Sequence, residues 1–185
     1  MTRADVRIAR RDAILGVLAC CVAPVAASAN ESDLPQKGDK LVFDAGPDDG
    51  KPLTVEGVAK STGVVLAVPL NAAGAKKTNS RFSKIALVQL KPEEIPEEYK
   101  ANAVDGVVAY SAICTHQGCT INAFNPTARN LECFCHHSQF SAAEGGGVAH
   151  GPAKKRLPML PLAKGEGGAL IVAGEFTGKP GPAPA

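Results

Sequence analysis

The chain has 185 residues; 45% are hydrophobic but only 4% are aromatic and none is Trp, so any buried core has to rest on Val, Leu, Ile, Ala and Phe. The formal net charge of +2 comes from residues 1–29, which hold four Arg and two Asp, and the remainder has equal numbers of basic and acidic residues. A neutral domain lacks the basic surface that nucleic-acid binding requires, so we expect no nucleic-acid partner.

Residues 1–29 have the layout of an export signal. An Arg-rich start is followed by an uncharged apolar run over residues 13–29, which ends in the small-residue cleavage site Ala27-Ser28-Ala29. The pair Arg10-Arg11 resembles a twin-arginine signal, which exports proteins already folded around a cofactor. We therefore expect a periplasmic protein. Two alternatives are an uncleaved membrane anchor through residues 13–29 and a lipoprotein site at Cys20.

After the leader, the sequence predicts a β protein. Gly and Pro number 19 and 14, and short Val-rich runs stand between them, which favours strands and turns over helices. The expected strands are residues 41–43, 64–68, 85–90, 107–113 and 169–173, with a tight turn at 145–147. Residues 30–40 are predicted to be a linker, residues 91–104 a solvated loop or short helical turn, and residues 178–185 a flexible tail.

Beyond the leader, nearly all Cys and His residues lie in two short segments. The first reads Cys114-Thr-His116-Gln-Gly118-Cys119 and the second Cys133-Phe-Cys135-His136-His137. Two thiolates and two imidazoles suit either tetrahedral zinc or an iron–sulfur cluster with two sulfur and two nitrogen ligands. Covalently attached haem is excluded, because only one residue separates Cys133 from Cys135. Zinc would leave two cysteines over, and an oxidising compartment would join such a pair as a disulfide.

Both segments closely resemble the two cluster-binding boxes of Rieske proteins of the disulfide-containing kind. That kind includes the iron–sulfur subunits of quinol:cytochrome c reductases and the small subunits of arsenite oxidases, and the resemblance covers about residues 107–162. It implies an all-β Rieske fold over residues 41–177, with an antiparallel sandwich-like base and an inserted cluster-binding subdomain at about residues 110–155. It also implies a [2Fe–2S] cluster with a reduction potential between about −150 and +300 mV.

The family's residue roles carry over by position. Cys114 and Cys133 would bind one iron of the cluster, and His116 and His136 the other. Cys119 and Cys135 would form a disulfide between the two loops. The remaining matched positions are Gly118 beside the ligands, Ser138, whose hydroxyl would donate to a bridging sulfide, and Phe140, which stands where high-potential members have Tyr. Because Phe lacks that hydroxyl, we expect a potential below the top of the Rieske range.

A third segment resembles the proline loop that covers the cluster in this family. It contains Gly151, Pro152, Lys154, Lys155 and Arg156, with Lys154 where a second proline is often found. Its three cations are either a solvated basic loop or a docking patch for an acidic partner. Quinol-oxidising relatives usually have Leu at the position of Gln117 and Gly at that of His137, so the polar residues here weaken the quinol interpretation without excluding it.

Three functions therefore compete. In the first two, the chain only transfers electrons and has no catalytic site of its own. One is the membrane-anchored subunit of a quinol:cytochrome c reductase. Another is a soluble periplasmic carrier or the small subunit of a molybdenum enzyme of the arsenite oxidase kind. By family analogy, a c-type cytochrome is the expected acceptor for both. A ring-hydroxylating oxygenase or its ferredoxin is disfavoured, because those proteins lack the disulfide pair and an oxygenase needs a second iron held by two His and a carboxylate.

Overall fold

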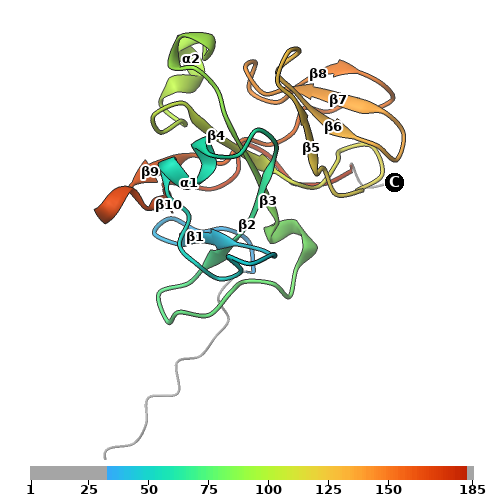
Figure 1. The fold of residues 1–185 in the computed structure, drawn as a ribbon. Coiled ribbons are helices and arrows are strands. Elements are labelled where there is room, and N and C mark those ends of the chain that lie inside the picture. The colour runs from blue at the N-terminus through green and yellow to red at the C-terminus, as the bar shows by residue number, and fades with distance from the viewer. Residues whose placement is uncertain (1–32, 183–185) are drawn as a thin grey trace, which may run out of the picture. The chain divides into compact units, whose positions relative to one another are not determined.

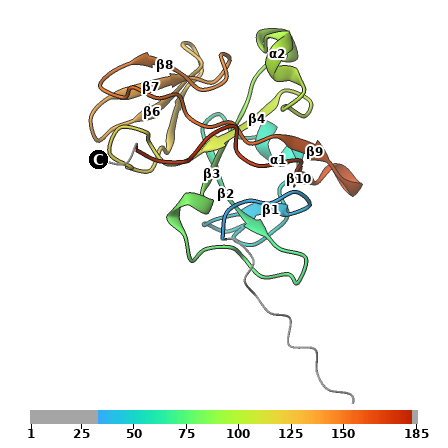
Figure 2. The same cartoon turned by 180° about the vertical axis from the view of Figure 1, so that it is seen from behind.

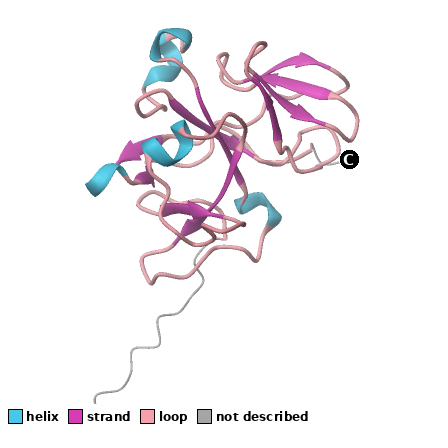
Figure 3. Cartoon of the chain, viewed as in Figure 1, coloured by secondary structure: helices cyan, strands magenta, loops and turns pink. Residues whose placement is uncertain are grey.

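The computed structural model describes residues 33–182, and these are mostly β structure (Figures 1 and 3). The predicted leader and residues 183–185 of the predicted tail lie outside the described residues. The ten strands of the described part form two antiparallel sheets, which confirms the predicted all-β class. Every helix within residues 33–182 is too short or too polar to cross a membrane.

The base of the molecule is a six-stranded sheet in the order β4-β3-β2-β1-β10-β9. Its strands are β1 (Lys40–Phe43), β2 (Val65–Leu70), β3 (Ile85–Gln89), β4 (Val107–Ser111), β9 (Leu162–Lys164) and β10 (Leu170–Val172). The N–H of Ser111 donates to the carbonyl of Pro158 at 2.9 Å, and the N–H of Leu160 donates to that of Ala109 at 2.8 Å. These bonds join β4 to the segment that enters β9, so the base is a nearly closed, barrel-like sheet.

The second sheet is inserted in the chain between β4 and β9 and has the strand order β5-β6-β7-β8 (Figure 2). Its strands are β5 (Ala123–Asn125), β6 (Asn130–Cys133), β7 (Ser138–Ser141) and β8 (Gly147–His150). The helical elements are short: η1 (Arg81–Ser83), η2 (Pro92–Glu94), η3 (Glu166–Gly168), α1 (Val55–Ala59) and α2 (Glu97–Lys100). Residues 91–104, which were predicted to be a solvated loop or a short helical turn, contain η2 and α2.

Strands β3 and β4 connect the two halves of the fold, because they are apolar on both faces. Side chains alternate between the faces of a strand. Leu87 and Ala109 accordingly pack into the core inside the base, whereas Val88 and Tyr110 pack into a second core with residues of the inserted sheet. This second core includes Cys114 and Cys133, so the uninterrupted apolar run at residues 107–110 leads directly into the first cysteine motif.

The chain before β1 is fixed to the base by a buried ion pair. The Lys77 ammonium lies 2.9 Å from the Asp39 carboxylate, and both side chains are 5% exposed. The backbone N–H of Gln36 donates to the same carboxylate at 2.9 Å. The part of the predicted linker that the structure describes is therefore packed against the domain. The polar composition of this segment predicts a linker, because composition does not indicate that Asp39 forms a buried ion pair.

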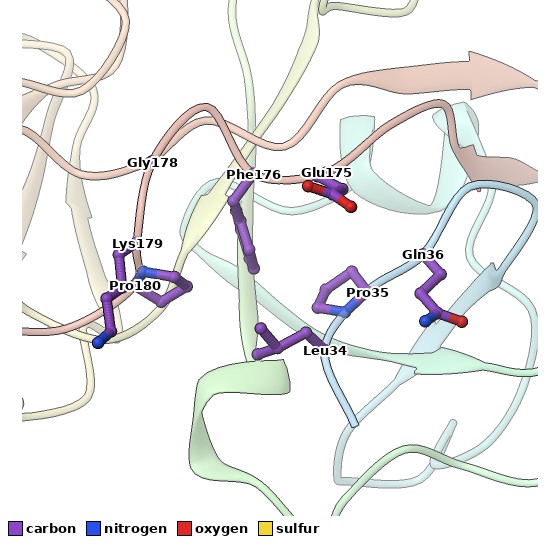
Figure 4. A pocket seen from close by; sticks show the side chains of 8 residues that line it. All are labelled: Leu34, Pro35, Gln36, Glu175, Phe176, Gly178, Lys179 and Pro180. Carbon is purple, nitrogen blue, oxygen red and sulfur yellow. The ribbon is translucent and has the colours of Figure 1, made fainter. Parts of the chain in front are cut away.

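The chain after β10 packs on the domain as well. Pro180 and Gly181 are buried, and a Cβ atom built on Gly181 would lie 2.5 Å from the ring of Phe82. A cavity of about 330 Å³ lies between this segment and the chain before β1. Figure 4 shows the side chains that line it, among them Leu34, Phe176 and Pro180. No Cys or His lines this cavity, so it is not formed by the Cys and His motifs of the sequence.

Candidate metal centre

Two loops carry the Cys and His motifs, and strand pairing brings them to one end of the inserted sheet. The first loop, residues 114–120, leaves β4 and is closed by the Cys114 N–H to Cys119 carbonyl bond at 2.8 Å. The second loop, residues 133–138, is the turn between β6 and β7, where Cys133 pairs with Ser138. Gly118 has a φ of +79°, a left-handed conformation that favours Gly, and allows the first loop to reverse direction.

The four cysteines of these loops form two different pairs. Cys119 and Cys135 are joined by a disulfide, which is the pairing that the family resemblance implies. The thiols of Cys114 and Cys133 are free and buried, and they are close enough to influence each other's protonation. Burial raises the pKa of the Cys114 thiol, the backbone N–H of His116 opposes that shift, and the neighbouring Cys133 adds to it. Only this second pair can supply thiolates to a metal.

A group of three neighbouring cysteine sulfurs cannot supply three thiolates to a metal. The Sγ atoms of Cys119, Cys133 and Cys135 all lie within 4.8 Å of one another. Two of them form the disulfide and carry no negative charge, so they are poor metal ligands. The disulfide therefore lies directly beside a free thiol of the candidate centre and ties the two loops together at that point.

The two histidines of the motifs also face each other across the loops. The ring centroids of His116 and His136 are 4.8 Å apart, and the rings are nearly perpendicular at 87°. The Nδ1 atom of His116 is buried and has no hydrogen-bond partner within residues 33–182. Leaving such an atom unpaired costs about 1–3 kcal/mol, so a buried lone pair without a partner indicates a position where a ligand belongs. His136 is exposed and brings one edge of the site to the surface.

The segment that resembles the proline loop is bonded to both cysteine loops. The Thr115 hydroxyl donates to the carbonyl of Lys155 at 2.5 Å, and the Ser138 hydroxyl accepts from the N–H of Ala153 at 3.2 Å. Gly151 has a φ of +89°, and a Cβ there would lie 2.5 Å from the carbonyl oxygen of His137. Close packing against the second loop therefore requires Gly at this position. Sequence reasoning did not single out Thr115 or Ala153, because their roles arise from contacts between distant segments.

The residues that the sequence places around the ligands are buried beside them. Ser138 is fully buried and its oxygen accepts from the N–H of Ala153, while its hydroxyl donates to no other group within residues 33–182. Phe140 is also fully buried, in the same core as Cys114 and Cys133. A hydroxyl added to its ring would therefore lie inside the protein rather than in water.

His137 and Arg156, which the sequence analysis also singled out, lie outside the group of candidate ligands. His137 is exposed and has a φ of +59°, a left-handed conformation that Gly adopts more easily than His. The Arg156 guanidinium donates to the hydroxyl of Tyr99 in α2 at 3.3 Å, so of the three cations in its loop this one is held by the domain itself. No motif pointed to Tyr99, which lies 57 residues from Arg156 in the chain.

Comparisons with known proteins agree with the donor set. A model of the Rieske [2Fe-2S] domain matches residues 83–161. A Rieske iron–sulfur subunit of the cytochrome bc1 complex from Streptomyces lividans is 36% identical over 54% of this chain and 59% of its own length. A protein described as the Rieske subunit of a respiratory nitrate reductase from Haloferax mediterranei is 40% identical over 43% of this chain and 35% of its own. The chain thus matches less than two thirds of the length of these relatives.

Solved structures of Rieske proteins are also similar to parts of the chain. The cyanobacterial plasma membrane Rieske protein from Synechocystis has 23% sequence identity and a TM-score of 0.42, over 64% of this chain and 93% of that one. The soluble domain of Rieske protein II from Sulfolobus acidocaldarius has 20% identity and a TM-score of 0.39, over 49% and 61%.

Proposed function

We propose a function from one premise: through residues 83–161 this chain belongs to the Rieske [2Fe-2S] proteins, and it is an iron–sulfur electron-transfer protein. Specifically, it is a periplasmic carrier that takes single electrons from a donor enzyme or a quinol and passes them to a c-type cytochrome. The observation that supports this role is the meeting of two free thiols and two imidazoles from separate loops, with one of the imidazoles at the surface.

The residues present fit a Rieske-type cluster. Cys114 and Cys133 would hold one iron through sulfur, and His116 and His136 would hold the other through ring nitrogen. The buried Nδ1 atom of His116, which has no partner among the described residues, supports that assignment, because a ligating nitrogen must not be occupied by a hydrogen bond. Zinc could use the same four donors, but the Rieske model matches the segment that holds all of them.

The chain's own residues position, shield and expose the centre. When bound, the cluster accepts and releases one electron at a potential that its two imidazole ligands raise above that of all-cysteine clusters. The disulfide between Cys119 and Cys135 keeps the two loops in register. Apolar packing around Cys114 and Cys133 excludes water from the sulfur side, while the exposed His136 provides a short path for electrons to a docked partner.

The test is an EPR-monitored redox titration of the purified, matured protein, together with its iron, sulfide and zinc content. We expect a signal typical of mixed sulfur and nitrogen ligation, a potential within the Rieske range, and iron and sulfide in equal amounts. A substitution of His116 by Ala should abolish that signal, whereas His150→Ala should leave it unchanged, because His150 lies on β8 outside the ligand group. Zinc without iron in properly matured protein would overturn the proposal.

A second candidate is the membrane-anchored Rieske subunit of a quinol:cytochrome c reductase. The bc1 relatives favour it, and an uncleaved segment at residues 13–29 would supply the anchor. Gln117 and Phe140 favour the non-quinol role, and the nitrate reductase relative is an example of a similar subunit named outside bc1 complexes. Fractionation of the native host and mass analysis of the mature N-terminus separate the two: cleavage after Ala29 supports the soluble carrier, and retention in the membrane supports the anchored subunit.

A further inference from the structure

The surface around the candidate centre has an unusual charge composition. It is formed by three loops, residues 114–120, 133–138 and 150–156, which we call the cluster tip. These loops contain three cations and four histidines, whereas they contain no Asp or Glu. The chain beyond the leader has equal numbers of basic and acidic residues in total, so the part outside the cluster tip carries an excess of acidic residues.

Two of the three cations at the cluster tip are free to meet a partner. Arg156 is held by Tyr99, as described above. Lys154 and Lys155 are exposed, and neither forms an ion pair within residues 33–182. Their loop is nevertheless fixed to the other two through Thr115 and Ser138. The two ammonium groups are therefore attached to an ordered surface immediately beside the candidate ligands.

Four glutamates lie beside the turns at the far end of the inserted sheet from the cysteine loops. Elements η2 and α2 carry Glu93, Glu94, Glu97 and Glu98. Arg129, in the turn between β5 and β6, forms an ion pair with Glu94 at 3.2 Å, and Tyr99 of α2 lies against Gly145 in the turn between β7 and β8. Both turns are at the far end of the strands from the cysteine loops. The third loop reaches these glutamates only at its last residue, Arg156, whereas the two cysteine loops and the preceding part of the third loop contain no acidic residue.

The cluster tip also presents an exposed aromatic ring. Phe134 is 64% exposed, and it lies between Cys133 and the disulfide-bonded Cys135. A large apolar side chain this exposed costs free energy in the isolated protein, and such residues are typical anchors of protein interfaces. An apolar centre with cations beside it is the pattern of a docking surface that is steered by charge.

We propose that the cluster tip selects redox partners with an acidic face, with Lys154 and Lys155 steering the encounter and Phe134 packing in the complex. The proposal rests on the electron-transfer function proposed above. In the productive encounter the reduced cluster loses one electron to the partner's redox centre, which is reduced by one electron, and no bond is formed or broken. The partner's acidic groups would face the lysines, and an apolar patch beside its redox centre would receive Phe134.

The test measures oxidation of the reduced holoprotein by stopped flow with two small oxidants of opposite charge. Hexacyanoferrate(III) represents an anionic partner, and tris(phenanthroline)cobalt(III) represents a cationic one. Ionic strength is varied between about 0.01 M and 1 M, where the Debye length falls from about 30 Å to about 3 Å. We expect the rate with the anion to fall as salt increases and the rate with the cation to rise or stay constant.

The variant Lys154→Gln/Lys155→Gln should lower the low-salt rate with hexacyanoferrate(III) by about tenfold, while changing the high-salt rate little. Its matched control is Lys37→Gln/Lys60→Gln, which removes two exposed cations from the base and should leave both rates unchanged. Equal salt dependence for the two oxidants, or an equal effect of the control variant, would overturn the proposal. Absence of the EPR signal before the reaction would instead show that the proposed function fails.

The role of Phe134 is measured with an acidic and a basic c-type cytochrome as acceptors. Phe134→Ser should reduce the rate with the acidic cytochrome at high salt, where steering is screened, whereas Phe134→Tyr should preserve it. The EPR signal and potential of both variants are compared with those of the parent protein, because Phe134 lies next to a ligand. If Phe134→Ser reacts as fast as the parent at unchanged potential, the ring has no part in docking. Faster reaction of the parent with the basic cytochrome would refute selection for acidic faces.

Discussion

The buried ion pair between Lys77 and Asp39 gives a sharp test of how the chain before β1 is held. The substitution Asp39→Asn keeps the shape of the side chain and removes its charge, so the buried ion pair with the ammonium of Lys77 is lost. Both side chains are 5% exposed and their charged atoms are 2.9 Å apart. Breaking a buried pair from one side costs about 3–5 kcal/mol, so we expect the free energy of unfolding to fall by about that amount.

The measurement is urea unfolding followed by far-UV circular dichroism. Asp48→Asn is the matched control, because the Asp48–Lys51 pair is 2.8 Å long but 50% and 66% exposed, and such pairs contribute about 0–1 kcal/mol. The double replacement Asp39→Leu/Lys77→Met removes both charges and should recover most of the loss. If Asp39→Asn and Asp48→Asn destabilise the protein equally, the reasoning from burial is wrong. The EPR signal of the cluster should be the same in all four proteins.

Three further predictions concern the candidate centre. His137→Gly should stabilise the protein by about 1 kcal/mol in the same unfolding assay, because it relieves a φ of +59°; His150→Gly, on a strand, should not stabilise it, and a gain there would contradict the argument. Phe140→Tyr should raise the reduction potential, because the new hydroxyl can donate to buried sulfur and so stabilise the reduced cluster; a titration that finds the potential unchanged would refute this, and Phe176→Tyr, beside the cavity of Figure 4, is its control. Replacing both Cys119 and Cys135 by Ser should lower the free energy of unfolding by about 3 kcal/mol, since the disulfide closes a loop across a sequence separation of 16 residues; a loss below about 1 kcal/mol would mean that contacts with the third loop already hold the two cysteine loops together.

Much of the base could be predicted from the sequence, because its strands are short apolar runs between turns. The expected strands at residues 41–43, 64–68, 85–90, 107–113 and 169–173 overlap β1, β2, β3, β4 and β10. The strands of the inserted sheet were less evident. Their residues are only partly apolar, because they lie on a small sheet that buries one face, and β8 is largely exposed. The short β9 and the five-residue α1 carry too little pattern to be predicted locally.

The chemistry of the site was determined by the sequence alone. Cys and His at the spacing of the two boxes supply a donor set that few cofactors accept, and that donor set does not depend on how the loops are oriented. Tertiary structure decided which of these residues meet. It placed the free thiols together, left the Nδ1 atom of His116 buried without a protein partner, and bonded the third loop to the other two.

Tertiary structure also decided where the charges act. In the sequence, Lys154, Lys155 and Arg156 form one run of three equal cations. In the fold, Arg156 is held by Tyr99 of α2, among the glutamates of η2 and α2, while the two lysines stay exposed without an acidic partner within residues 33–182. The physical reason is that ligand identity is a property of residue type and spacing, which the chain carries locally. Burial, pairing and polarity depend on which distant segments the strands bring into contact.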